Sequence, residues 1–390
     1  MPIVNRVADL QPDIQAWRRD IHQHPELGYD EHRTAAFVAE RLREFGCDEV
    51  ATGLGGTGVV GRIKGRKPAG KGDVRSIGLR ADMDALPIEE ATGLPYASKT
   101  SGKMHACGHD GHTAMLLGAA RYLAETRNFA GEAVVIFQPA EEGGFGAAAM
   151  IKDGLFERFA IDQVYGMHNG PGIPVGSFAI RPGPIMASTD AVNIYIEGRG
   201  GHAARPHLSI DSVMVGAQLV TALQSIVSRS VDPLEAAVIS MCEFHAGNAR
   251  NVIPQTAEIR GTVRTLTADV RALVEKRVRE VVAGVAQMTG AKIDLEYLRG
   301  YPVVVNHAAE TDFAIKVAED VAGNGHVQEM PPLMGGEDFA YMLEKRPGAF
   351  IFCGNGDSAG LHHPAYNFDD NAIVFGTSYW IKLVENTLAA

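Results

Sequence analysis

The residues best suited to chemistry in this chain lie in one short run, residues 105–112. The run contains three histidines, one cysteine and one aspartate within eight positions, where a segment of helical spacing begins. Thiolate and imidazole ligands at this density are typical of transition-metal sites. Cys107 and His109 are two residues apart, so on an irregular turn both side chains can point the same way. The run therefore predicts a metal site.

Further side chains of the metal-ligand type follow predicted strands. In open parallel sheets, ligands gather beyond the carboxyl ends of the strands, so these side chains are expected to converge. Glu141 and Glu142 should point to opposite sides of extended backbone, so that one can bind metal while the other acts as a general base. Each cluster alone could be a solvated turn, but all carry the same ligand chemistry. The clusters are Asp82 with Asp84, Glu141 with Glu142, His168, and His362 with His363.

The elements that must position these residues alternate between strands and helices at both ends of the chain. Such alternation predicts an α/β domain with a mostly parallel sheet and helices on both faces. The expected strands are residues 77–81, 132–137, 163–167 and 349–353. The expected helices are residues 9–24, 30–45, 112–125, 310–322 and 337–344.

The middle of the chain has a different order: strand, helix, strand, strand, helix, strand. A unit of about one hundred residues with this βαββαβ order is large enough to form an α+β domain of its own. Its expected elements are residues 189–198, 209–228, 236–246, 255–265, 268–289 and 292–298. The prediction is therefore a discontinuous catalytic metal-binding domain, residues 1–187 and 300–390, with residues 188–299 inserted as a second domain.

The composition argues against several other classes of protein. The chain of 390 residues has a net charge of -11, which disfavours binding to a nucleic-acid backbone. It shows no basic segment followed by an apolar leader, and no apolar run of membrane-spanning length. The four cysteines are scattered and suggest no disulfide framework, so the cytoplasm is the expected compartment. Residues 65–72, rich in lysine and glycine, are expected to form a surface turn.

The sequence also resembles the amidohydrolase branch of the dimetal carboxypeptidase/aminoacylase superfamily. That branch contains hippurate hydrolases, auxin-amino-acid conjugate hydrolases and N-acyl-L-amino-acid amidohydrolases. The similar motifs follow one another in order over nearly the whole chain. They are residues 22–28, 80–87, 105–112, 138–142, 166–168, 200–207, 251–254, 335–339 and 361–364.

The resemblance implies a centre of two divalent metal ions, with Mn, Zn, Ni and Co all admissible. It implies that Glu141 is the general acid and base, and that Asp84 is a carboxylate that orients a ligand. The implied metal ligands are Cys107, His109, Glu142, His168 and His362, with His363 as the fallback for His362.

For the inserted domain, the resemblance implies a lid and dimerisation role. His202 would stabilise the tetrahedral intermediate, reaching the site of the partner subunit in a homodimer. Asn251 and Arg264 would help hold the substrate, and Arg264 is a plausible partner for its carboxylate. Whether His202 acts in its own subunit or across the dimer stays open.

One position departs from the wider superfamily. Where many relatives begin the motif at residues 82–84 with a metal-binding histidine, this chain has Asp82. Cys107 and His109 would supply the replacement ligands, and the thiolate makes the site softer. The remaining residues of the opening run are less well defined: Asp110 and His112 suit the free N–H groups at a helix start, while His105 has no role. His22 and His24 are expected to be structural.

The expected function is metal-dependent hydrolysis of the amide bond of N-acyl amino acids, such as hippurate-like conjugates, which releases a carboxylic acid and a free amino acid. Glu141 would take a proton from a metal-activated water, and His202 would share the oxyanion charge.

Three alternatives stay open. A dinuclear aminopeptidase or dipeptidase would need an acidic pocket group such as Glu337 or Asp338 to bind a free amine. A cysteine-nucleophile hydrolase would use Cys107 with a neighbouring histidine, which leaves the paired glutamates idle. A metal-binding or ligand-binding module would keep the fold without turnover.

Overall fold

The computed structural model describes residues 4–68 and 74–389, which separate into two compact units. The second unit is Pro184–Val304 with Pro332–Glu337, and the other described residues form the first unit. The sequence-based boundaries placed the insert at residues 188–299, without the short segment at residues 332–337. Residues 69–72 of the expected surface turn lie outside the described residues. Among the described helices, none is both long and apolar enough to cross a membrane.

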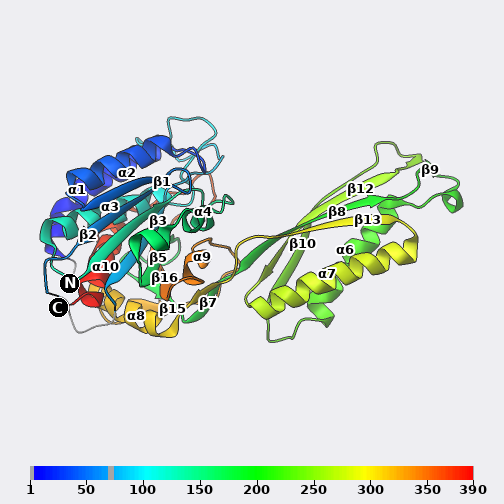
Figure 1. Cartoon of the computed structure of the whole chain (residues 1–390). Coiled ribbons are helices and arrows are strands. Elements are labelled where there is room, and N and C mark those ends of the chain that lie inside the picture. The colour runs from blue at the N-terminus through cyan, green and yellow to red at the C-terminus, as the bar shows by residue number, and fades with distance from the viewer. Residues whose placement is uncertain (1–3, 69–73, 390) are drawn as a thin grey trace. The chain divides into compact units, whose positions relative to one another are not determined.

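An eight-stranded sheet forms the centre of the first unit (Figure 1). In spatial order its strands are β1 (Glu49–Leu54), β2 (Gly58–Lys64), β4 (Glu132–Gln138), β3 (Ser76–Asp82), β5 (Gln163–Gly170), β16 (Gly348–Gly354), β6 (Phe178–Ile180) and β15 (Val327–Glu329). The central strands β4, β3, β5 and β16 are parallel, whereas β1, β2 and β4 pair antiparallel. The central strands are near-continuous apolar runs because both of their faces are buried.

Helices pack against this sheet and position its ligand-bearing ends. α2 and α3 contact β2, and α8 contacts β16, so these helices share one large apolar cluster with the sheet. The short helices α4, α5 and α9 bury side chains outside that cluster, and α4 contacts β4. The helices are α1 (Asn5–Gln23), α2 (His32–Glu44), α3 (His109–Thr126), α4 (Gly146–Lys152), α5 (Leu155–Phe159), α8 (Ala308–Ala322), α9 (Ala340–Leu343) and α10 (Ile373–Thr387). The helix expected over residues 337–344 is therefore shorter than predicted.

The second unit contains a four-stranded antiparallel sheet in the order β10-β12-β8-β13. Its elements are β8 (Ser188–Glu197), α6 (Ser212–Arg229), β10 (Ala237–Ala246), β12 (Thr256–Thr265), α7 (Ala268–Thr289) and β13 (Lys292–Arg299). Along β8 buried and less buried residues alternate, since α6 and α7 cover only one face of the sheet (Figure 1). This order of elements and strands is that of a ferredoxin-like α+β unit.

Short elements complete the chain. Two-residue strands β9 (Gly201–His202) and β11 (Val252–Ile253) form an antiparallel ribbon, and β7 (Gly183–Met186) pairs with β14 (Val304–Asn306). Two 3₁₀ turns, η1 (Pro206–Leu208) and η2 (Asp370–Ala372), precede α6 and α10.

Candidate metal centre

The loop before α3 places two of the predicted ligands. Gly108 caps the helix with φ 86°, a left-handed conformation that suits glycine. A Cβ at this position would lie 2.4 Å from Asn169 Nδ2 and 2.5 Å from the Tyr366 hydroxyl. Only glycine therefore lets the chain turn here, with Cys107 just before the helix and His109 as its first residue.

His109 has the hydrogen-bonding pattern of a metal-ligating imidazole. Its Nδ1 lies 3.2 Å from Asp84 Oδ1, while its buried Nε2 has no hydrogen-bond partner among the described residues. A carboxylate that holds one ring nitrogen commonly orients the other toward a metal. Burial would lower the pKa of His109, but Asp82, Cys107 and the hydrogen bond to Asp84 together outweigh it and raise the pKa well above its usual value. Surroundings that favour a proton on this ring also favour a metal cation.

His168, on β5, faces Cys107 in the loop before α3. The sequence predicted that His168 follows a strand ending at residue 167. β5 in fact continues to Gly170, so His168 lies within the strand. Its Nδ1 donates to the backbone carbonyl of Asn169 at 2.7 Å, which leaves the Nε2 lone pair 3.4 Å from Cys107 Sγ. Burial lowers the pKa of His168 and raises that of the Cys107 thiol. The ring is therefore neutral, and a bound cation would be needed to keep the sulfur as a thiolate.

The paired glutamates lie in a turn, which corrects the expectation of extended backbone with side chains on opposite sides. Ala140, just before them, has φ 50°, and residues 141–144 form turns and a bend. Carboxylate oxygens of both Glu141 and Glu142 lie within 4.8 Å of each other and of a His109 ring nitrogen. The turn therefore brings both carboxylates to the same histidine.

Asp84 and His362 hold Glu142 from two directions. Asp84 Oδ2 accepts a hydrogen bond from the Glu142 backbone N–H at 2.9 Å, so one aspartate contacts both His109 and the glutamate turn. His362 Nε2 lies 3.0 Å from Glu142 Oε1. His362 itself adopts φ 64°, a conformation that is strained for a residue with a side chain and often marks a functional site.

Three overlapping groups of ligand atoms result, each within 4.8 Å. They are Cys107 with His109 and His168, Cys107 with Glu142 and His362, and His109 with Glu141 and Glu142. Soft sulfur, imidazole nitrogen and carboxylate oxygen suit first-row transition metals. Two ions in a dinuclear centre stand about 3.5–4 Å apart, which shared groups of this size can accommodate. The residues present therefore fit two divalent ions.

A further grouping, Asp82 with His109 and His112, is unsuited to a metal. His112 Nε2 accepts a hydrogen bond from the Asn169 backbone N–H at 2.8 Å, so its Nδ1 carries the proton that faces Asp82 at 2.6 Å. Arg80 Nη1 contacts the other Asp82 oxygen at 2.7 Å. Both nitrogens of His112 are thus engaged, and a guanidinium already compensates the Asp82 charge.

Two residues that the sequence did not single out tie the ligand loops together. Asn169 Nδ2 donates to the Cys107 carbonyl at 2.6 Å, and the Tyr366 hydroxyl donates to Asn169 Oδ1 at 2.8 Å. The His362 backbone N–H also donates to the Ala106 carbonyl at 2.8 Å. The only sequence signal for Asn169 was its place beside His168, and Tyr366 had none.

The second unit carries the other predicted site residues. His202 is exposed on β9, opposite Val252 of β11, and the Ala203 backbone N–H donates to the Asn251 carbonyl at 3.1 Å. Arg264 pairs with Thr189 at the other end of β12. From Thr256 to Arg264 the strand advances by eight residues, a span of about 26 Å. The structure thus brings His202 near Asn251 and places Arg264 toward the opposite end of β12.

The histidines without a predicted catalytic role have hydrogen-bond partners other than the proposed ligands or, within the described part of the chain, none. His22 Nδ1 is 2.8 Å from Asp110 Oδ2, and buried Arg18 approaches the same carboxylate at 2.9 Å. His24 Nδ1 donates to the Asp20 carbonyl at 2.7 Å. His105 is buried, and its ring nitrogens have no hydrogen-bond partner among the described residues. Burial lowers the pKa of His105 to about 4, so its ring is neutral.

An α/β unit with these overlapping groups of ligands, interrupted by a ferredoxin-like unit, defines a dinuclear metallohydrolase. The chain belongs to Peptidase family M20/M25/M40, whose sequence profile matches residues 78–386. This membership confirms the resemblance found in the sequence, and the chain is a hydrolase of the amide-bond class.

Individual relatives are similar over almost their full length. The chain is 44% identical to a hippurate hydrolase of Campylobacter jejuni, over 98% of both chains. It is 43% identical to an N-acetyl-L-cysteine deacetylase of Bacillus subtilis, over 94% of this chain and 86% of that one. The crystal structure of the Bacillus subtilis YXEP protein, a dinuclear metal binding peptidase from the M20 family, superposes with a TM-score of 0.83 at 36% identity, over 98% and 99% of the two chains.

Proposed function

We propose that this protein hydrolyses the amide bond of N-acyl amino acids and releases a carboxylic acid and a free amino acid. The observation that carries the proposal is the approach of Glu141, Glu142 and His109 within 4.8 Å at one end of the sheet. It places a carboxylate beside a ligand cluster, as amide hydrolysis by an activated water requires. The relatives named above, a hippurate hydrolase and an N-acetyl-L-cysteine deacetylase, support this substrate class.

The proposed metal ligands divide the donor atoms between two ions. Cys107, His109, Glu142, His168 and His362 would hold them, with Asp84 orienting His109. Such ions, when bound, lower the pKa of water toward about 7 and polarise the amide carbonyl. The donor set admits Mn, Zn, Ni and Co. The cytoplasm is the proposed compartment, because the Cys107 thiol must stay reduced to act as a ligand.

Glu141 is the proposed general acid and base. Its carboxylate takes a proton as the water oxygen attacks the carbonyl carbon, and later delivers a proton to the amine nitrogen as the C–N bond breaks. The side chain is 7% exposed, so little water competes for the proton. Asn251 and Arg264 are proposed substrate contacts, with the Arg264 guanidinium matched to the amino-acid carboxylate.

We further propose that the protein is a homodimer in which His202 serves the active site of the partner subunit. Support comes from the second unit itself. Arg264 lies at the end of the sheet where the chain enters and leaves this unit, whereas His202 lies on the β9–β11 ribbon that precedes the opposite end of β12, and Thr256 and Arg264 at the two ends of β12 are about 26 Å apart. One copy of the unit therefore cannot bring both side chains to one substrate molecule.

A hydrolysis screen tests the substrate class. After chelator treatment, activity on N-acetyl, N-benzoyl and longer N-acyl amino acids should disappear, and adding back Mn, Zn, Co or Ni one at a time should restore it. Unblocked dipeptides should be poor substrates. Preference for unblocked dipeptides would indicate the aminopeptidase alternative. Turnover that is insensitive to the chelator would support the alternative in which Cys107 is the nucleophile.

His202→Ala is expected to lower kcat about 100-fold with little change in KM, because its imidazole would act on the oxyanion alone.

Subunit mixing then separates action within a subunit from action across the dimer. Glu141→Gln and His202→Ala subunits, each inactive alone, should regain about a quarter of wild-type activity when mixed, since half of the dimers are mixed and each has one complete site. No recovery in confirmed mixed dimers would place His202 in its own subunit's site.

A further inference from the structure

The segment 28–31, in the connection between α1 and α2, packs against the turn that carries the paired glutamates. Nothing in the proposed chemistry uses this segment. Gly28 lies so close that a Cβ there would be 3.1 Å from both Ala140 Cα and Ala140 Cβ. The Tyr29 hydroxyl donates to the Gly144 carbonyl at 2.5 Å. The turn is therefore held near both of its ends by one short piece of chain.

Glu31 makes the most direct contact. Its side chain is fully buried, and its Oε1 accepts a hydrogen bond from the Ala140 backbone N–H at 2.8 Å. Its Oε2 accepts from the Thr57 hydroxyl at 2.6 Å, so both oxygens are engaged and the carboxylate is fixed. The two bonded residues, Glu31 and Ala140, are 109 positions apart in the chain.

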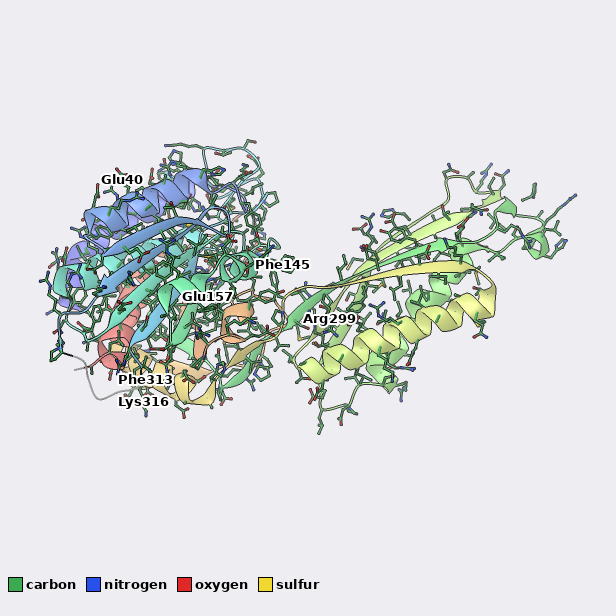
Figure 2. All side chains as sticks on the ribbon, viewed as in Figure 1. Glu40, Phe145, Glu157, Arg299, Phe313 and Lys316 are labelled. Atoms are coloured by element: carbon green, nitrogen blue, oxygen red, sulfur yellow. The ribbon has the colours of Figure 1, made fainter. Side chains whose placement is uncertain are left out.

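The contact acts at a strained point of the backbone. Ala140 has φ 50°, in the left-handed region that residues with a Cβ rarely adopt. Glu141 follows directly, so the Ala140 conformation sets the direction in which the Glu141 side chain leaves the backbone. Tyr29 and Phe145 also have positive φ, at 68° and 61°, and Phe145 stands at the start of α4 (Figure 2). Strain concentrated around one turn points to a function that the surrounding structure must enforce.

We infer that segment 28–31 is a positioning device for the general base, in which the Glu31 carboxylate holds Ala140 in its left-handed conformation and thereby aims Glu141. Asp84, whose Oδ2 would lie 3.7 Å from a Cβ at Gly28, accepts the Glu142 backbone N–H, so buried carboxylates hold the backbone N–H groups of the residues before and after Glu141. The inference rests on the proposed role of Glu141. Glu31 bonds to Ala140 and Thr57 and belongs to none of the ligand groups, so it acts through Ala140.

The test compares two substitutions of Glu31 in the metal-loaded protein. Glu31→Ala should lower kcat about 30- to 100-fold, with KM within about twofold and metal content unchanged, because a small misplacement of a catalytic group has a large cost in rate. Glu31→Gln should keep most of the activity, since its carbonyl oxygen can still accept from Ala140 while its amide donates to Thr57. Equal loss in both variants would overturn the inference.

Glu26→Ala is the matched control from the same stretch of chain. The Glu26 carboxylate accepts the backbone N–H groups of Arg33 and Thr34 at 2.9 and 2.8 Å, at the start of α2 and not on the glutamate turn. It should lower the melting temperature without lowering kcat. If Glu31→Ala lowers kcat no more than this control does, its role is structural only and the inference is wrong.

Two further variants test the inference if Glu31→Ala does not fold and separate it from the proposed role of Glu141. If Glu31→Ala does not fold, Tyr29→Phe removes one exposed hydroxyl, and it should lower kcat severalfold without changing the melting temperature; an unchanged kcat would overturn the inference. Glu141→Gln separates the two proposals. If that variant stays active, the base assignment fails, whereas an inactive Glu141→Gln beside a fully active Glu31→Ala refutes only the positioning role.

Discussion

Replacing Glu141 by glutamine is expected to lower kcat by at least about a thousandfold while both metal ions stay bound. Glutamine has the same shape as glutamate but cannot take a proton from water at neutral pH. Because Glu141 shares its neighbourhood with Glu142 and His109, an isosteric change should leave the ligand atoms in place. The measurement pairs steady-state kinetics on an N-acyl amino acid with elemental analysis of the purified protein.

Glu40→Gln provides the control for this change. Glu40 is exposed on α2 and belongs to the same unit as Glu141 (Figure 2). The control should match the wild-type protein in rate, metal content and melting temperature. If Glu141→Gln retains more than about a tenth of the wild-type kcat, Glu141 is not the general base.

Replacing Glu142 by alanine should have the complementary effect, loss of metal. Glu142 offers its carboxylate to two of the ligand groups, one with Cys107 and His362 and one with His109. Its removal takes a shared anionic donor from the centre, so we expect at least one of the two ions to be lost and kcat to fall more than about 100-fold. Removing the side chain also leaves His362 Nε2 without its 3.0 Å partner.

Metal content and affinity decide this prediction independently of turnover. Elemental analysis should give one ion or fewer per subunit, and competition with a chelating dye should show weaker binding of added Mn or Zn. Glu157→Ala, an exposed glutamate of α5 in the same unit, should retain both ions (Figure 2). Two tightly bound ions in Glu142→Ala would exclude Glu142 as a ligand.

Much of the fold was predictable because its strongest signals are local. The central strands β3, β4, β5 and β16 are short apolar runs that only a sheet covered on both faces can bury, and their positions match the predicted strands to within three residues at either end. The elements of the second unit follow amphipathic patterns of period two and 3.6. The prediction did not include α10, whose residues are buried on nearly every side.

The sequence by itself determined which atoms are available for chemistry. Sulfur, imidazole and carboxylate groups placed at strand ends and at a helix start imply a metal site whatever the details of packing, and their order along the chain identifies the family. Ligand chemistry is a property of residue type, and the edge of the sheet at which residues appear follows from the alternation of strands and helices.

Only the tertiary structure decided how those atoms are used. It turns Glu141 and Glu142 toward one histidine, where extended backbone would have separated them. In the folded chain both ring nitrogens of His112 are hydrogen-bonded, so Asp82 and His112 do not form a metal site of their own. The fold also brings the Glu31 carboxylate to the Ala140 backbone N–H. Each of these outcomes depends on a hydrogen bond between residues far apart in sequence, and no local pattern of residue types encodes such a partner.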